Sequence, residues 1–266
     1  MKMINRTVFL GAIPIIIILL VWQIISQEKI VSPVFLPPVS SILLKLYTSF
    51  TGGNKLYSLP QNSLLTLERM FLGYFLGAAI AIPLGLLIGS NKRIHRLLEP
   101  TLEILRPLPA VALIPVFILL IGINIQMFIV FIAYGCIWPI LINTIDGVKS
   151  IEPLYFDVAK LFRVTAKKAF FKVTLPASSP FIASGMRISL LLALLLTIVI
   201  EMTSGFNGLG WSTIYAQQLS DITTLYAEIF LISIVGFCLN FVFIRGENRV
   251  MNWHKQFTKS AVETTV

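Results

Sequence analysis

Six apolar stretches, each close to the length needed to cross a bilayer, constrain this chain more than any other feature. They cover residues 8–26, 64–88, 101–122, 126–146, 180–203 and 226–244. A helix crosses the hydrocarbon core with about twenty apolar residues, and in lipid only helices and closed barrels satisfy their own backbone hydrogen bonds. The pattern therefore predicts an all-α polytopic membrane protein with about six transmembrane helices.

Composition supports this interpretation. Of the 266 residues, 56% are hydrophobic and only 12% are charged, whereas a soluble domain has about 25% charged residues. The first stretch follows the charged start "MKMINRT", as the core of a signal peptide would. Its apolar run is long for a signal peptide and no small-residue cleavage site follows, so we expect a retained helix.

The basic residues predict the orientation. Six crossings place both termini on one side, and that side holds fifteen of the 21 basic residues, whereas the other side holds three. The fifteen are Lys2, Arg6, Lys92, Arg93, Arg96, Lys149, Lys160, Arg163, Lys167, Lys168, Lys172, Arg245, Arg249, Lys255 and Lys259; the three are Lys29, Lys45 and Lys55. Because short cytoplasmic loops are enriched in Lys and Arg, we expect both termini in the cytoplasm. The net charge of +9 follows from these dispersed loops, and no nucleic-acid motif accompanies it.

The segments group into three parts. Residues 1–63 are expected to form an N-terminal transmembrane helix and an extracytoplasmic amphipathic segment, which prolines interrupt before a short helix. Residues 64–246 form a core of five transmembrane helices with a cytoplasmic loop at 147–179. Residues 247–266 form a cytoplasmic tail.

Small residues recur along the second apolar stretch, "FLGYFLGAAIAIPLGLLIGS". Every fourth position is small: Gly73, Gly77, Ala81, Gly85 and Gly89. In lipid, such a stripe lets two helix backbones approach closely. It serves either packing within the protomer, which we favour, or a dimer seam.

Three polar side chains within or at the ends of apolar stretches are candidates for a translocation path. Arg106 either pairs with Glu103 or a loop carbonyl, or lines the path. Glu201 is either solvated at the outer interface or part of a gate. Asn143 either bonds a neighbouring helix or faces the path.

Motifs for catalysis are absent from the sequence. There is no GxxxxGK[ST], HExxH, GxSxG or CxxC, and Cys136 and Cys238 lie in apolar runs as packing residues. We therefore expect no enzymatic activity, no metal site and no cofactor in this chain. Energy for uphill transport would come from a partner.

The segment "DVAKLFRVTAKKAFFKVTLP", residues 157–176, resembles the EAA loop of permease subunits in bacterial ABC importers. The usual pattern is E-A-A-x-x-x-G, nine residues, then I-x-L-P. Asp157, Val158 and Ala159 stand at the first three positions, Arg163 stands at the glycine, and Val173, Leu175 and Pro176 complete the pattern. Nearly the whole chain, including "LEILRPLPAVALIPVFILLIGI" and "EMTSGFNGLGWSTIYAQQLSD", is similar to the nitrate/sulfonate/taurine branch of these permeases.

The resemblance implies a type I ABC importer permease in the bacterial cytoplasmic membrane, specific for a small polar or anionic solute. Two permease subunits would form the path, in a homodimer, which we favour, or a heterodimer. A cytoplasmic ATPase dimer holding ATP and Mg would bind the EAA loops, and an extracytoplasmic binding protein would deliver the solute. Alternating access would move it. A thiamine-precursor-like substrate, an ion-coupled carrier, a channel and a scaffold remain alternatives.

Within the loop, Pro153 favours the start of a short helix. Its apolar surface would come from Phe156, Ala159, Leu161 and Phe162, and it would insert into a groove of the ATPase. We expect Arg163 to turn the chain with negative φ, since arginine is strained at positive φ. We expect Leu175-Pro176 to end a second helix before the fifth span.

Overall fold

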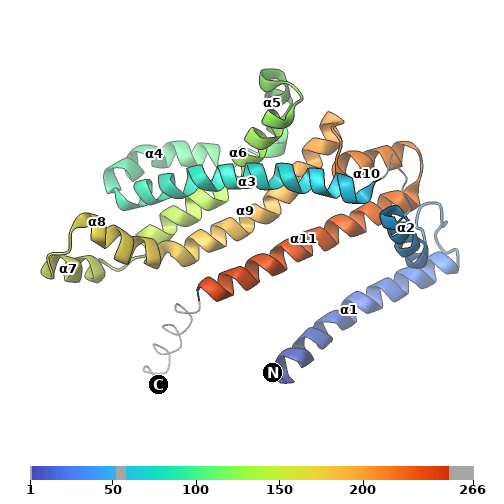
Figure 1. Ribbon diagram of the computed structural model, residues 1–266, viewed down its shortest axis with the longest axis horizontal. Helices are drawn as coiled ribbons and strands as arrows, with labels where there is room; N and C mark the ends of the chain where they lie inside the picture. Colours follow the sequence, from blue (N-terminus) through green and yellow to red (C-terminus); the bar gives the residue numbers. More distant parts are fainter. Residues whose placement is uncertain (1, 52–57, 252–266) are drawn as a thin grey trace. The chain divides into compact units, whose positions relative to one another are not determined.

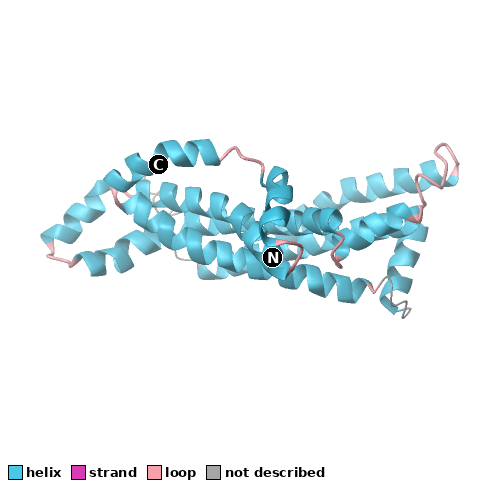
Figure 2. Ribbon diagram, turned by 90° about the horizontal axis from the view of Figure 1, so that it is seen from above, coloured by secondary structure: helices cyan, strands magenta, loops and turns pink. Residues whose placement is uncertain are grey.

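The computed structural model describes residues 2–51 and 58–251, and in these ranges its regular structure is entirely helical (Figures 1 and 2). The helices are α1 (Lys2–Gln27), α2 (Val39–Thr51), α3 (Leu59–Ser90), α4 (Lys92–Leu105), α5 (Ile114–Ile121), α6 (Ile125–Lys149), α7 (Pro153–Leu161), α8 (Ala166–Ala169), α9 (Leu175–Ser204), α10 (Leu209–Gln218) and α11 (Ile222–Val250). A 3-10 turn (Ala110–Leu113) precedes α5, and a π-helical turn (Phe170–Thr174) joins α8 to α9. The predicted all-α class is confirmed.

Four continuous helical runs in the described residues are long and apolar enough to cross a membrane: Leu59–Ser90, Ile125–Lys149, Ala166–Ser204 and Ile222–Val250. A fifth candidate is the pair formed by α4 and Ala110–Ile121, which meet at a bend of 79° and form either a broken span or a re-entrant loop. The prediction of one span over 101–122 was therefore wrong in detail. Pro107 and Pro109 lie at the break, where each lacks the amide hydrogen that a continuous helix needs. The 26-residue α1 covers the first predicted span, but its apolar part in the described residues, Ile13–Gln27, is shorter than a span, so the described residues contain four or five candidate crossings and not the six predicted.

The expected helix stop at Leu175-Pro176 was also wrong, because Ala166–Ser204 is one helical run. The Leu175 amide donates to the Phe170 carbonyl, five residues back, instead of four. Such a wider π turn re-registers the backbone bonds just before Pro176, which itself has no amide hydrogen to donate. The helix can therefore continue through Pro176.

The chain forms two compact units: residues 1–65 with 201–234, and residues 66–200 with 235–266. In the first unit, α1 is fixed to the segment that precedes α2. The Trp22 indole donates to the Pro37 carbonyl over 3.0 Å, and the Ser26 hydroxyl donates to the Leu36 carbonyl over 2.6 Å. Trp22 also meets Tyr226 of α11 edge to face, at 5.4 Å between ring centroids. These contacts hold the proline-rich turn against the end of α1.

Asp221 fixes the start of α11 in the same unit. Its carboxylate accepts from the Thr224 amide at 3.1 Å and from the Thr224 hydroxyl at 2.6 Å, which is an N-cap arrangement. Lys45 of α2 completes the site at 3.3 Å. Partial burial acts to raise the pKa of Asp221, but the bonds from Thr224 and Lys45 outweigh it and the pKa lies below its usual value.

The second unit is built around α6. The small-residue stripe of α3 lies against it: a Cβ added to Gly73 would stand 2.6 Å from Ile132 Cβ, and one added to Gly85 would stand 2.6 Å from Thr144 Cβ. Ala81, in the middle of the stripe, is fully buried. Backbone approach this close gives the dense van der Waals contact that associates helices in lipid.

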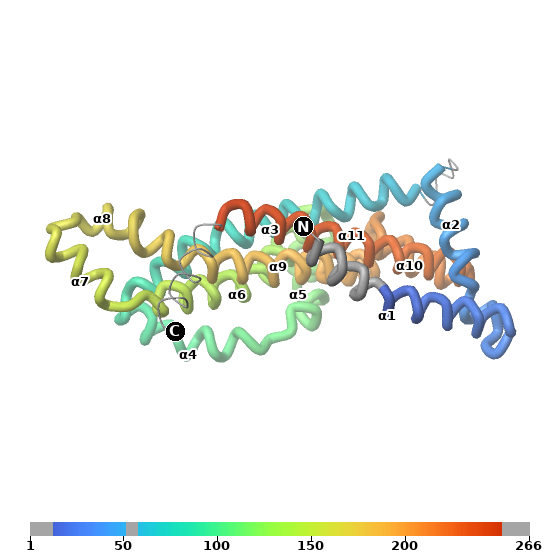
Figure 3. Tube along the Cα trace, turned by 90° about the horizontal axis from the view of Figure 1, so that it is seen from below, coloured from blue at the N-terminus to red at the C-terminus, as the bar shows by residue number. Residues whose placement is uncertain are grey.

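Helix α9 packs on α6 through glycines on both helices. A Cβ on Gly147 of α6 would lie 2.6 Å from Phe181 Cβ, and one on Gly185 of α9 would lie 2.9 Å from the Pro139 carbonyl oxygen. The Ser189 hydroxyl adds a hydrogen bond to the Cys136 carbonyl over 2.9 Å. Figure 3 shows α6 and α9 running alongside each other toward the α7–α8 end.

We predict that Gly85→Ala destabilises the protein whereas Gly246→Ala does not. The new methyl group at position 85 would overlap the Thr144 side chain, while at position 246 no atom lies within 4 Å. Overpacking costs about 1–3 kcal/mol, whereas Gly→Ala in an open helix gains about 1 kcal/mol. Thermal unfolding midpoints in detergent measure both. Equal midpoints for the two variants would contradict the close α3–α6 contact.

Candidate functional site

The predicted coupling loop, residues 147–179, forms α7 and α8 at one end of the second unit (Figure 1). Pro153 occupies the first turn of α7, as expected, after an extended Glu152. A proline is well placed there, because the first amides of a helix have no partner within it. This start aims α7 away from the end of α6.

One side of α7 presents apolar side chains to solvent. Leu154, Val158, Leu161 and Phe162, here called the α7 stripe, are 64%, 44%, 79% and 74% exposed. Their spacing places them on one face of the helix and its last turn. The expected apolar surface differs in part, because Phe156 and Ala159 are half-buried. Asp157 lies off the stripe and pairs with Lys160 at 3.2 Å.

Arg163 turns the chain after α7 with φ of 51°, so the expectation of negative φ was wrong. The Arg163 amide donates to the Lys160 carbonyl at 2.9 Å, and the Val164 amide donates to the Ala159 carbonyl at 2.8 Å. These two bonds make the Schellman motif that commonly ends helices, in which the left-handed position is usually glycine. The backbone bonds thus impose a conformation that arginine adopts at a cost of about 1 kcal/mol.

The last three residues of the loop pattern lie apart from the α7 stripe. Val173 belongs to the π-helical turn, and Leu175 and Pro176 begin α9. All three are half-buried, and Leu175 packs on a cluster containing Leu86 and Val148. In the structure these residues anchor the loop to the membrane helices, while α7 carries the exposed surface.

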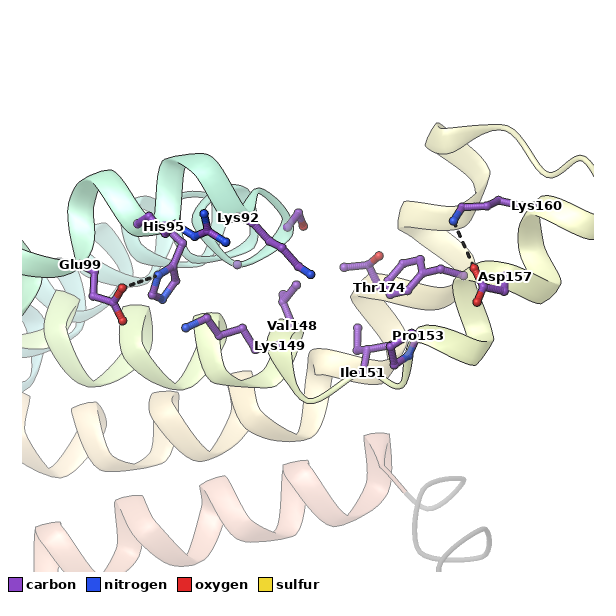
Figure 4. Close-up of a pocket in the computed structure, with 14 residues that line it drawn as sticks. Lys92, His95, Glu99, Val148, Lys149, Ile151, Pro153, Asp157, Lys160 and Thr174 are labelled. Atoms are coloured by element: carbon purple, nitrogen blue, oxygen red, sulfur yellow. Dashed lines mark hydrogen bonds and ion pairs between the residues drawn. The ribbon is translucent and has the colours of Figure 1, made fainter.

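Three hollows follow one another along α4 and α6 in the second unit. The largest, about 760 Å³ and here called the basic basin, lies at the α7 end and is lined by Lys92, His95, Arg96, Lys149 and Lys160 among others (Figure 4). A middle hollow of about 160 Å³ shares His95, Glu99 and Lys149 with it. An inner hollow of about 460 Å³ shares Arg106 and Ile142 with the middle one. The shared residues make the series continuous.

Two of the three predicted path residues line the inner hollow together. Arg106 lies at the C-terminal end of α4, where the bent crossing breaks, and Asn143 lies on α6. The Asn143 amide donates to the Pro139 carbonyl at 2.8 Å, which fixes its orientation. In the described residues no ion pair joins Arg106 to Glu103, although both line the middle hollow. Arg106 thus lines both the middle and the inner hollow without an ion pair to Glu103.

Glu201, the third candidate, lies in the first unit and is fully buried, so the expected interfacial solvation was wrong. Its carboxylate accepts from the Gly210 amide at 3.0 Å, near the positive end of α10. The carboxylate lies against Gly208, where an added Cβ would displace it. Glu201 lines none of the three hollows, and its observed contacts position the start of α10.

Sequence reasoning passed over two buried ionisable residues. Arg69 of α3 is 4% exposed and its guanidinium lies 5.2 Å from the centre of the Phe128 ring. Glu228 of α11 is fully buried, and neither carboxylate oxygen has a hydrogen-bond partner among the described residues. Their positions inside apolar stretches were the available signal. The described residues contain no cluster of three or more metal-ligating side chains.

Comparison with known proteins decides the family. Residues 81–250 match the model of the family described as binding-protein-dependent transport system inner membrane component. The chain belongs to this family. It is 31% identical to a putative aliphatic sulfonates transport permease protein of Bacillus subtilis, over 91% of this chain and 86% of that protein. It is 34% identical to a bicarbonate transport system permease protein of Synechocystis, over 84% of this chain and 81% of that protein.

A solved structure supports the fold. The MetNI methionine ABC transporter in an inward-facing conformation matches with a TM-score of 0.61 and 20% identity, over 70% of this chain and 93% of that one. The expected family, the permease subunits of ABC importers, is confirmed by the family model and the relatives. The protein is a multi-pass inner-membrane permease subunit of an ABC importer, a family that works with an ATPase and a substrate-binding protein.

We predict that Arg163→Gly in this permease preserves assembly with the ATPase and raises stability. Glycine adopts a φ of 51° without the penalty that arginine incurs, so the gain is at most about 1 kcal/mol. Thermal unfolding and ATPase co-purification measure the two effects. Loss of the ATPase from the variant would show that the Arg163 side chain itself takes part in coupling.

Proposed function

We propose that this permease imports a small anionic or polar solute, driven by an ATPase that docks on the α7 stripe. The single observation that carries the proposal is the exposed α7 stripe on a helix outside the membrane spans. Exposed apolar side chains gathered on one helical face are typical of a protein interface, and an amphipathic helix commonly docks in a groove. The basic residues of this loop favour a cytoplasmic position, where the ATPase resides.

The proposed substrate class is supported by the positive charge of Arg106 and by the names of two relatives. The two relatives named above transport aliphatic sulfonates and bicarbonate, according to their names, and both solutes are oxyanions. Arg106 provides a permanently charged fork of donors at the inner hollow, a geometry that suits a carboxylate or sulfonate. Asn143 adds an amide at the same hollow. We assign these two residues to the translocation path and Glu201 to positioning α10.

The proposed importer contains three kinds of partner besides this chain. A second copy of this chain completes the path as a homodimer, and an extracytoplasmic binding protein supplies the solute. ATP and Mg bind to the ATPase, since this chain has no P-loop. Closure of the ATPase dimer moves α7, and the membrane helices switch between outward and inward access. Residues Asp157, Val158 and Ala159 lie on the helix that receives this movement.

Substitution of the α7 stripe tests docking. We expect Val158→Ser with Leu161→Ser to reduce ATPase binding about tenfold or more, because removal of buried apolar anchors commonly costs over 1 kcal/mol. Both side chains are exposed in this chain alone, so the variant should keep its fold. Co-purification of the ATPase is the measurement.

Lys167→Gln with Lys168→Gln, on the neighbouring α8, is the matched control and should retain the ATPase. Normal ATPase recovery with the stripe variant would refute docking at α7. Uptake that continued without any ATPase, driven by an ion gradient, would instead identify a secondary carrier.

Substitution of Arg106 tests its assignment to the translocation path. We expect Arg106→Gln to abolish stimulation of ATP hydrolysis by the solute and its binding protein, while Arg106→Lys retains part of it, since only the second keeps the positive charge. ATPase assembly should be unchanged in both, because Arg106 is remote in sequence from α7. Full stimulation in Arg106→Gln, measured with sulfonates and bicarbonate in turn, would remove Arg106 from the path.

A further inference from the structure

The basic basin holds more positive charge than its own carboxylates pair. Lys92, His95, Arg96, Lys149 and Lys160 line it, against Glu99 and Asp157. Asp157 pairs with Lys160 at 3.2 Å, and Glu99 lies 3.6 Å from His95. In the described part of the chain, Lys92, Arg96 and Lys149 form no ion pair. With His95 counted as neutral, four cations and two carboxylates line the hollow, which leaves an excess of two positive charges.

The lining side chains come from separate elements. Figure 4 shows Lys92 extending from the start of α4 over Val148 of α6, toward Thr174 and the Asp157–Lys160 pair of α7, while Lys149 extends from α6 toward His95 and Glu99. Asn91 fixes the start of α4 by accepting from the Arg93 amide at 2.9 Å. The buried Val148 and half-buried Ile151 and Phe156 supply an apolar wall. The basin therefore has both charged and apolar walls, and the Asn91 cap fixes the start of the helix that carries Lys92.

Membrane orientation alone does not account for this arrangement. The bias of Lys and Arg toward cytoplasmic loops requires basic residues on that side, but not that they line one hollow. Lys167 and Lys168 show the difference, because they lie in the same cytoplasmic loop, are exposed and do not line the basin. Like charges gathered around a hollow repel one another unless an anion occupies it.

We propose that the basic basin binds a phosphate-type oxyanion, carried either by the headgroup of an anionic lipid or by a free anion of the cytoplasm. Lys92, Arg96 and Lys149 would hold the oxyanion by charge-assisted hydrogen bonds. The apolar wall and the volume of about 760 Å³ leave room for an organic group attached to it. Because α7 forms part of the rim, an occupied basin stabilises one position of α7. This site is distinct from the proposed path, and its test requires neither ATP nor the transported solute.

The experiment uses the full chain, delipidated in a nonionic detergent, and follows thermal unfolding. One arm titrates sodium sulfate at an ionic strength held constant with chloride, which removes general screening. The other arm titrates phosphatidylglycerol in mixed micelles against phosphatidylcholine. We expect a saturable rise of the unfolding midpoint in at least one arm. Sulfate stabilisation identifies a free anion as sufficient, and stabilisation by phosphatidylglycerol alone identifies the lipid headgroup.

Matched double variants locate the effect. Lys92→Gln with Lys149→Gln should weaken the saturable binding about tenfold or more, because two charge-assisted contacts are lost. Lys167→Gln with Lys168→Gln removes the same charge outside the basin and should bind as the unmodified protein does. An equal loss of saturable binding in the two double variants would show a general effect of charge and would overturn the proposal. Absence of saturable stabilisation in both arms would overturn it as well.

Discussion

Close backbone contact between α6 and its two neighbours is the constraint on which the second unit depends. In lipid no hydrophobic force drives helices together, so attraction comes from dense van der Waals packing and hydrogen bonds. Glycines of α3 meet Ile132 and Thr144 of α6, and Gly147 and Gly185 bring α9 to the other part of its surface. This three-helix contact fixes α6, and α6 lines all three hollows and ends just before the segment that forms α7 and α8.

Much of the fold was predictable because its determinants are local in the sequence. The length of an apolar stretch reports a membrane span, and the four-residue period of small side chains places them on one helical face. Residues 101–122 were harder, since hydropathy averages over the break where Pro107 and Pro109 interrupt the crossing. Pro176 was expected to end a helix, but the helix continues through it. The π-helical turn before it is not visible in composition or period, and it removes the conflict between proline and helix.

The candidate site was likewise predictable from the sequence only in part. Spacing located the helix that Pro153 begins, but it did not give the rotation of α7 about its axis. That rotation places Leu154 and Val158 outward and Phe156 inward, and it depends on packing against residues distant in sequence. Arg163 follows the Schellman hydrogen bonds instead of its own intrinsic preference. Glu201 was expected at the solvated interface, yet the glycine-containing segment that follows it, at Gly208 and Gly210, folds back over its carboxylate. In these two cases, backbone hydrogen bonds and contacts within a few residues decide the outcome, and residue type and hydropathy do not reveal them.

The uninterrupted helix from Ala166 to Ser204 has a mechanical consequence. At 1.5 Å per residue, these 39 residues extend about 58 Å, so one helical run joins the α7–α8 end to a membrane span. The π-helical turn at Phe170–Thr174 changes the hydrogen-bond register of this run without ending it. Because the close contacts with α6 at Gly147 and Gly185 lie within the same run, a displacement of α8 would be carried along the helix to its contact with α6.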